Sequence, residues 1–272
     1  MRLSELGELG LLRELEARGL AQRIEHDAAQ LDGGVVVTQD ALVENVHFRL
    51  DWISWRDLGF RAAAVNLSDL AASGAGAEGL IVTLAVPADV TLDDVLALYE
   101  GLNEAGAPVL GGDTTAAPLV LLSVTALGRA ARVPGRAGAR PGDLVVVTGP
   151  LGAAGAVFRR QRFVRPPLRL AEGRRLAAVA HAMLDVSDGL AVDASHIAER
   201  SGCRVVIELE HVPLADGATR EDLAFGEDYE LLAATPDPLE FAVIGRCEEG
   251  EGVVFLERGE PVELSGWQHF TR

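Results

Sequence analysis

The chain has 272 residues, of which 49% are hydrophobic, and it carries a formal net charge of −17 at pH 7. This length suffices for one large domain or two modest ones with a real core. The acidity argues against nucleic acid and against an anionic membrane as partners. All 24 basic residues are arginine. A P-loop, a protein kinase and Schiff-base catalysis each need a lysine, so these classes are excluded.

In the first half of the chain, hydrophobic spacing predicts helices at residues 3–20, 56–73 and 91–104 and strands at 35–38, 80–86, 109–110 and 119–127. Gly74 stands where the second helix should end, and Thr91 is the expected N-cap of the third. The following stretch, residues 128–142, is rich in Arg, Gly and Pro. Such a composition predicts a joint between two domains.

In the second half, strands are expected at residues 144–148, 183–186, 204–209, 229–234, 241–244 and 252–256, and helices at 153–160, 172–182 and 189–200. Strands and helices alternate throughout, which is typical of the α/β and α+β classes. We therefore predict two lobes, an N-terminal domain at residues 1–130 and a C-terminal α/β domain at residues 131–272.

The cysteine content and the N-terminal residues bear on location. Cys203 and Cys247 are far apart and form no C-x-x-C motif, so zinc and redox motifs are absent from the sequence. Residues 1–20 carry acidic side chains and no apolar stretch of the kind found in a signal peptide. No apolar run is long enough to span a bilayer. The predicted location is the cytoplasm, with both cysteines as free thiols.

Short aspartate motifs are the most informative feature of the sequence. Each lies beside Gly, Ser or Thr, and most close an apolar run; they contain Asp27, Asp40, Asp69, Asp113, Asp185, Asp188 and Asp228. Carboxylates at strand ends lie where sheets bind ligands. If they converge, each like-charged pair at ~4 Å costs about 4 kcal/mol at an effective dielectric of 20. Oxygen ligands of this kind select hard cations, and Mg²⁺ on few protein ligands usually carries phosphate.

Several of these candidate residues can be interpreted either structurally or functionally. Asp69 lies three residues after Asn66 and shares a face of the predicted helix with it. Asp188 opens the helix at 189–200, where an N-cap alone would explain it. The glycines at 111–112 lie in a predicted loop, where they would let the backbone approach a ligand. Arg136 lies in the joint, where it would suit a phosphate or remain a solvated charge.

Taken together, the motifs resemble one family. Segments 65–75, 111–115, 138–143, 185–190 and 226–232 stand in the same order as the motifs of thiamine-monophosphate kinases. The chain also resembles that family at residues 5–8 and 266–270, so the similarity covers essentially the whole sequence.

The resemblance implies a two-lobed fold like that of aminoimidazole ribonucleotide synthetase, and a homodimer. Residues 1–130 would bind ATP and Mg²⁺ and form the dimer. The implied reaction is direct in-line transfer of the γ-phosphoryl group of ATP to thiamine monophosphate, giving thiamine diphosphate. The implied Mg²⁺ ligands are Asp27, Thr38, Gln39, Asp40, Asp69, Asp113, Asp185 and Asp188. The implied ATP contacts are Tyr99, Gly112, Asp113, Arg136 and Ser187. The implied thiamine phosphate contacts are His47, Glu227 and Trp267. The implied catalytic residues are Asp69, Asp113 and Arg136.

The chemistry of this reaction suits such a set. The acceptor is a phosphate oxygen that is already ionised, so no strong base or protein nucleophile is needed. Two polyanions must instead be positioned and the charge of the transferred group neutralised. The chain departs from the family pattern at His26, Gln39 and Phe225, and it is short at residues 159–169 and 215–225. These departures concern the number of bound metal ions and the rate of the reaction more than the fold.

Three alternatives remain open. The first is a superfamily synthetase that acts on another small phosphorylated substrate. The second is a nucleotide-binding homologue with weakened catalysis, and the third is a metal-dependent phosphatase. Selenophosphate synthetase would need a reactive Cys or Lys near the N-terminus, and a hydrogenase-maturation relative would need a C-terminal Cys. This chain has no Lys and no Cys before Cys203, and its last residues are Phe270-Thr271-Arg272.

Overall fold

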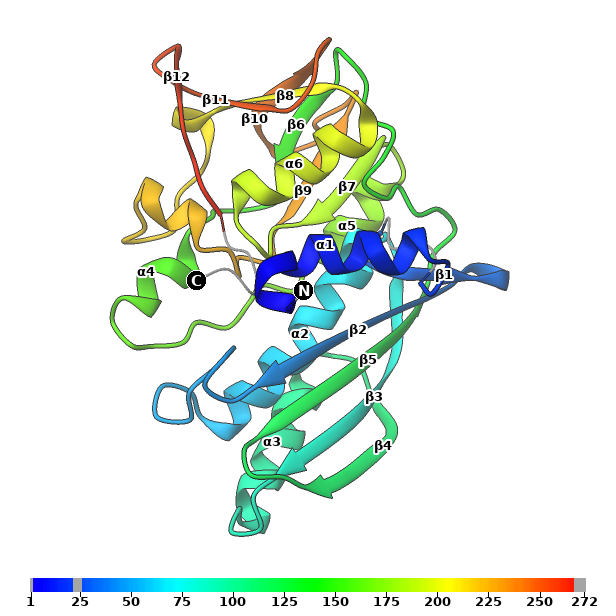
Figure 1. Cartoon of the computed structure of the whole chain (residues 1–272), viewed down its shortest axis with the longest axis vertical. Helices are drawn as coiled ribbons and strands as arrows, with labels where there is room; N and C mark the ends of the chain where they lie inside the picture. The colour runs from blue at the N-terminus through cyan, green and yellow to red at the C-terminus, as the bar shows by residue number, and fades with distance from the viewer. Residues whose placement is uncertain (1, 22–25, 267–272) are drawn as a thin grey trace.

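Two sheets, one in each lobe, form the framework of the molecule (Figure 1). The computed structural model describes residues 2–21 and 26–266. The N-terminal sheet has the strand order β1-β2-β5-β3-β4, and the C-terminal sheet has the order β12-β11-β8-β10-β6-β9-β7. The predicted two-lobed α/β class is confirmed.

The N-terminal lobe places two helices on one face of its sheet. Its elements are α1 (Leu3–Ala17), β1 (Ala29–Leu31), η1 (Asp32–Gly34), β2 (Val35–Val43), α2 (Trp55–Ala72), β3 (Gly76–Val86), α3 (Leu92–Glu104), β4 (Val109–Ala116) and β5 (Leu121–Arg129). Strand β5 pairs antiparallel with both β2 and β3, and β4 pairs parallel with β3 at the edge. Leu58, Leu84 and Leu98 are among the fully buried residues between the helices and the sheet.

Two sequence predictions in this lobe need correction. The strand expected at residues 35–38 continues to Val43, because β2 pairs with β5 along its whole length. Residues 111–115, expected as a loop, lie inside β4, because they pair with residues 81–85 of β3. A Cβ on Gly112 would overlap with the backbone oxygen of Val82. This glycine therefore allows β4 to approach the neighbouring strand.

The C-terminal lobe begins after an irregular stretch that corresponds to the predicted joint. Its elements are β6 (Leu144–Val147), α4 (Ala153–Phe158), α5 (Leu170–Ala177), β7 (Ala182–Asp185), α6 (Leu190–Ser201), β8 (Arg204–Glu208), η2 (Leu209–His211), η3 (Arg220–Ala224), β9 (Leu231–Thr235), β10 (Ala242–Glu248), β11 (Val253–Glu257) and β12 (Glu260–Val262). All pairs in this sheet are antiparallel except β11 with β8. Cys203 and Cys247 are buried free thiols, as expected.

Helix α2 belongs to both lobes. Ser54 caps its first turn by accepting a hydrogen bond from the backbone N–H of Asp57, and Gly74 follows its end in the left-handed conformation. Ala71 and Ala72, near its C-terminal end, form a core cluster with residues of the C-terminal lobe such as Met183 of β7. Since its other side packs on the N-terminal sheet, α2 fixes the lobes to each other.

Glycine allows α2 to lie this close to its neighbours. A Cβ on Gly101 of α3 would overlap with the backbone oxygen of Arg56, and one on Gly59 would overlap with that of Leu98. On the other side of α2, a Cβ on Gly173 of α5 would overlap with the backbone oxygen of Ala71. The helices are therefore in backbone contact at these crossings.

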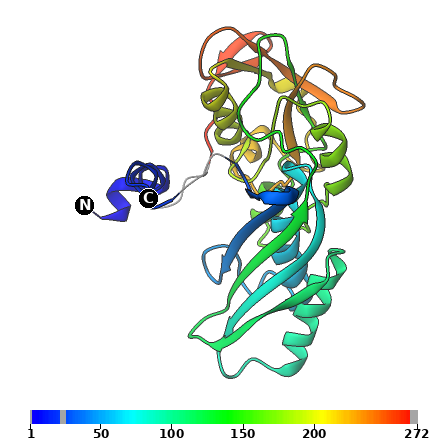
Figure 2. The ribbon, with the colours of Figure 1, turned by 90° about the vertical axis from the view of Figure 1, so that its right-hand side faces the viewer.

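Helix α1 stands clear of the rest of the molecule (Figure 2). Its predicted break is present at Gly7, which has a φ of 71°, whereas Gly10 remains helical. None of its described residues belongs to a core cluster. Both views place it on the side of the N-terminal sheet opposite to α2 and α3. Among the described residues, no helix is long and apolar enough to cross a bilayer.

The crossing of α2 and α3 predicts a large loss of stability for Gly101→Ala. The new methyl group must displace the backbone at Arg56, so we expect a loss of about 3 kcal/mol in the free energy of unfolding. Urea denaturation measures this loss. Gly76→Ala is the matched control, because the atom nearest to its Cβ, at 3.4 Å, belongs to the Arg174 side chain. Equal stabilities of the two variants would contradict the proposed backbone contact.

Candidate active site

Three carboxylates from distant parts of the chain converge between the lobes. Asp27 precedes β1, Asp69 lies on α2, and Asp185 ends β7. One oxygen atom of each lies within 4.8 Å of the others. We call these three residues the acidic cluster. The sequence indicated these aspartates, and the contacts of α2 with β2 and β7 explain why they meet.

Neutral side chains and one arginine orient the acidic cluster. The Thr38 hydroxyl donates to Asp69, and the Ser68 hydroxyl donates to Oδ2 of Asp185 at 2.5 Å. Arg136 Nε, from the joint between the lobes, donates to Oδ1 of Asp27 at 2.9 Å. Each carboxylate is therefore held in one orientation by a partner on a different element.

Burial and mutual repulsion dominate the electrostatics of this region. Burial, followed by the charges of Asp27 and Asp188, raises the pKa of Asp40 to about 6. Burial and the charge of Asp27 raise the pKa of Asp185 to about 8. Burial and the charges of Asp40 and Asp185, followed by that of Asp27, also raise the pKa of Asp69 well above its usual range. A set of converging carboxylate oxygens that resist ionisation fits a hard divalent cation.

A fourth buried carboxylate supports the turn between β7 and α6. Asp193 lies in the first turn of α6, and its Oδ2 accepts a hydrogen bond from the backbone N–H of Asp188 at 3.0 Å. Burial and the charges of Asp188 and Asp185 raise the pKa of Asp193 well above its usual range. Sequence analysis did not single out Asp193. Its position five residues after Asp188 on an otherwise apolar helical face was the available signal.

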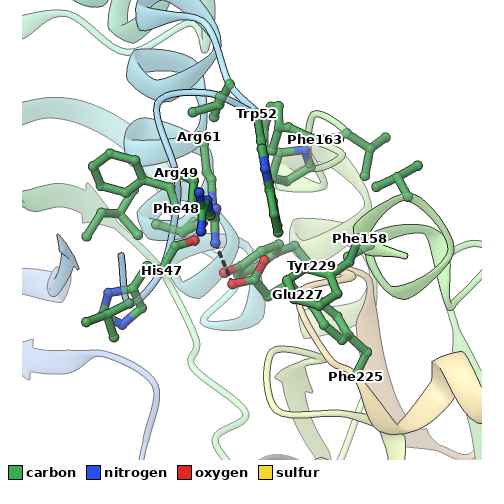
Figure 3. A pocket seen from close by; sticks show the side chains of 18 of the residues that line it. His47, Phe48, Arg49, Trp52, Arg61, Phe158, Phe163, Phe225, Glu227 and Tyr229 are labelled. Carbon is green, nitrogen blue, oxygen red and sulfur yellow. Dashed lines mark hydrogen bonds and ion pairs between the residues drawn. The ribbon is translucent and has the colours of Figure 1, made fainter. Parts of the chain in front are cut away.

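A cavity of about 500 Å³ adjoins the acidic residues. Figure 3 shows side chains that line this cavity. Asp40, Ser187 and Asp188 line one part of it. The backbone N–H of Asp40 donates to Oδ1 of Asn66 at 3.1 Å. Asn66 shares a face of α2 with Asp69, and this bond ties that face to the strand that carries Asp40. The remaining lining includes His47, Glu227 and several aromatic side chains.

Glu227 enters the cavity from a strained turn. Glu227 and Tyr229 have φ values of 58° and 52°, in the left-handed region that favours glycine. Such conformations cost roughly 1–3 kcal/mol each and cluster at functional sites. Between them, Asp228 points away and accepts a hydrogen bond from the backbone N–H of Gly152 at 2.8 Å, next to α4.

Arg61 of α2 is the partner of Glu227. Its guanidinium forms an ion pair with Glu227 and donates to the backbone oxygen of His47 at 2.6 Å. The Arg61 side chain is only 5% exposed. Burial raises the pKa of Glu227, and the Arg61 charge opposes that effect. Sequence analysis missed Arg61, although it is the one charged residue within the apolar stretch 58–67 of the predicted helix.

Three aromatic rings meet at the side of the cavity. The ring centroids of Trp52 and Phe158 lie 5.5 Å apart in an edge-on arrangement, and those of Phe158 and Phe225 lie 4.8 Å apart. Trp52 precedes α2, whereas Phe158 ends α4 and Phe225 follows η3, so the rings join the two lobes. Sequence analysis noted Phe225 only as a departure from a family pattern and missed the other two.

Comparison with known proteins agrees with this architecture. Residues 25–130 match the model of the AIR synthase related protein N-terminal domain, and residues 140–256 match that of the C-terminal domain. The thiamine-monophosphate kinase of Aquifex aeolicus (strain VF5) is 34% identical, and the alignment covers 99% of this chain and 100% of that protein. The enzyme of the same name from Mycobacterium tuberculosis (strain ATCC 25618 / H37Rv) is 35% identical, with 98% and 93% covered.

The chain belongs to the thiamine-monophosphate kinase family.

A solved structure of AaThiL complexed with AMPPCP and TMP superimposes with a TM-score of 0.90 at 34% identity, covering 99% of each chain. The hydrogenase maturation protein HypE reaches a TM-score of 0.72 at 19% identity, with 94% of this chain and 97% of that chain covered. At that identity the likeness shows a common fold alone.

The other residues expected from the thiamine-monophosphate kinase motifs lie apart from the acidic cluster. Gln39 faces the opposite side of the N-terminal sheet from Asp40, where its amide nitrogen donates to Ser123 Oγ at 2.9 Å. We call the side of the sheet that carries Gln39 its open face. Asp113 is exposed on this face: it pairs with Thr83, which pairs with Ser123, which pairs with Ala41, two residues after Gln39. Tyr99 is half-buried against the N-terminal core. Trp267 lies outside the described residues.

The raised pKa of Asp185 predicts a pH-dependent stability in the presence of a chelator. The unfolded carboxyl titrates near 3.8 and the folded one near 8. The folded state therefore binds more protons between these values, and stability falls as pH rises through this range. Asp185→Asn should raise the melting temperature at the upper end of the range, by about 2–4 °C per kcal/mol of repulsion and desolvation removed. Differential scanning calorimetry measures this.

The matched control is Asp89→Asn, which changes an exposed carboxylate on the turn before α3. It should leave the pH dependence of the melting temperature as in the wild type. An Asp185→Asn variant whose stability falls as steeply with pH as the wild type would contradict the assigned repulsion.

Proposed function

We propose that this chain transfers the γ-phosphoryl group of ATP to the phosphate of thiamine monophosphate and forms thiamine diphosphate. The observation that carries the proposal is the position of the acidic cluster beside an aromatic cavity. Asp40 and Asp188 line the cavity and also act electrostatically on the acidic residues. A substrate with an aromatic body and a phosphate end would therefore place its phosphate near the carboxylates.

Asp27, Asp69 and Asp185 would hold Mg²⁺, with Asp40 and Asp188 beside them. Bound Mg²⁺ supplies neutralisation of the charge on the transferred group. The protein holds the ligand oxygens in place before any substrate arrives. Thr38 and Ser68 fix two of the carboxylates, and Arg136 fixes the third. Such preorganisation is the main contribution of a protein to phosphoryl transfer, since the acceptor phosphate needs no base.

The substrate contacts follow from the same geometry. His47 and Glu227 line the cavity and would contact thiamine monophosphate. Nδ1 of His47 accepts a hydrogen bond from the backbone N–H of Val43 at 3.0 Å, so the neutral ring carries its proton on Nε2. Arg136 and Ser187 would contact ATP, with Tyr99 and Gly112 as further expected contacts. The expected role of Trp267 stays a prediction.

We further propose that two copies pair through the open face of the N-terminal sheet. Ile81 is 41% exposed on this face and Leu110, on its edge strand, is 60% exposed. Gln39 and Asp113 lie on the same face. Within one protomer Asp113 faces away from Asp40. We infer that Asp113 completes the site of the partner, so that residues 1–130 form the dimer. We place the enzyme in the cytoplasm, where its free thiols would persist.

The activity is tested by incubating the chain with ATP, MgCl₂ and thiamine monophosphate and measuring thiamine diphosphate by chromatography. Asp69→Asn should lower kcat by about 10² or more, because one charged oxygen ligand is lost from the acidic cluster. Asp89→Asn is the matched control and should retain wild-type turnover. Binding of ATP without product would favour a non-catalytic homologue. Phosphate release without the acceptor would favour a phosphatase, and either result would overturn the proposed reaction.

The trans arrangement predicts complementation between two inactive variants. Asp69→Asn and Asp113→Asn should each be inactive as homodimers. When they are co-expressed, each heterodimer has one site with both aspartates intact, so about a quarter of wild-type activity should return with random pairing. No recovery in isolated heterodimers would place Asp113 in its own protomer's site, and an active Asp113→Asn homodimer would place it outside any site. A monomer in sedimentation velocity would overturn the dimer itself.

A further inference from the structure

We propose that Trp52, Phe158 and Phe225, named here the aromatic wall, bind the positively charged ring of the substrate by cation–π attraction. This assigns recognition of the charge to the three rings rather than to the nearby carboxylate of Glu227. The inference deepens the proposed function and rests on it, because a thiazolium is the delocalised cation that thiamine monophosphate would bring into this cavity.

The wall is built from both lobes and faces the cavity. All three residues line the cavity, and their rings form a continuous series with centroid separations of 5.5 and 4.8 Å. Neighbouring rings are inclined by 75° and 43°. Inclined rings present π faces in more than one direction, which is the arrangement that surrounds organic cations.

Phe158 is 49% exposed although it lies within this series of rings. A large ring kept half in contact with water between two lobes loses hydrophobic stabilisation that a buried ring would supply. A ligand that covers the ring would recover that free energy. Exposure of Phe158 therefore points to an occupant of the cavity.

Glu227 is poorly suited to attract the cation. Its carboxylate already forms an ion pair with Arg61, whose side chain is buried and fixed by the backbone oxygen of His47. Figure 3 shows this pair and the aromatic wall around the same space. An incoming cation meets a compensated pair, and separating Arg61 from Glu227 would leave a buried charge unpaired. The remaining role for Glu227 is hydrogen bonding.

Trp52 already attracts a cation in this structure. The guanidinium carbon of Arg49 lies 5.0 Å from its ring centroid. Arg49 does not add net repulsion, because both oxygens of Asp51 accept hydrogen bonds from it at 3.0 Å. The π face of Trp52 is thus within reach of positive charge.

The test compares two ligands that differ in charge alone. One is thiamine monophosphate, and the other is its thiophene isostere, in which carbon replaces the charged ring nitrogen. Dissociation constants are measured by isothermal titration calorimetry with wild type, Phe225→Leu and Trp52→Leu. Each leucine variant should weaken binding of thiamine monophosphate about tenfold and that of the isostere about twofold. Phe241→Leu is the matched control, because Phe241 stacks with Arg175 outside the cavity and should leave both constants unchanged.

Equal losses for the two ligands would mean that the rings act only as apolar surface, and would overturn the proposal. A wild-type protein without preference for the charged ligand would also overturn it. The binding readout separates the two proposals. A protein that binds with the predicted charge dependence but yields no thiamine diphosphate would retain the aromatic wall and refute the kinase reaction.

Discussion

Repulsion among buried carboxylates is the constraint on which the site depends. Two unit charges of like sign at a separation of 4.8 Å repel by about 3.5 kcal/mol at an effective dielectric of 20. Asp27, Asp69 and Asp185 nevertheless stay within 4.8 Å of one another. Helix α2 makes this possible, because it is bound on one side by the N-terminal sheet and on the other by a core cluster of the C-terminal lobe. The convergence of the acidic cluster therefore depends on both lobes.

Different residues of α2 serve the site and the packing of the helix. Asn66 accepts a hydrogen bond from the backbone N–H of Asp40, Ser68 orients Asp185, and Asp69 belongs to the acidic cluster. The glycines and alanines at the crossings provide the close packing. Arg61, two turns earlier, compensates the carboxylate in the cavity. One helix therefore positions residues of both the acidic cluster and the neighbouring cavity. Residues that serve function at a cost in stability are usual in active sites.

Local patterns predicted much of the framework. The lobes, the capped ends of α2 and α3 and the aspartates worth considering all follow from spacing and turn chemistry. The rest depended on distant contacts. Arg61 and Glu227 are 166 residues apart, and the rings of the aromatic wall come from three separate segments. Asp113 was expected in a loop, but the parallel pairing of β4 with β3 turns it to the open face. Its role, like that of Trp267, stays a prediction.

The shared helix has a consequence for how substrates reach the site. Enzymes with two lobes often admit ligands by hinging the lobes apart. Here such a rotation would pull α2 out of one hydrophobic interior or break the backbone contacts at Gly101 and Gly173. Residues 45–53 and 162–166 border the cavity and lie outside α2, so a ligand would instead enter past these two segments. Access to the cavity would then depend on short segments beside a rigid pair of lobes.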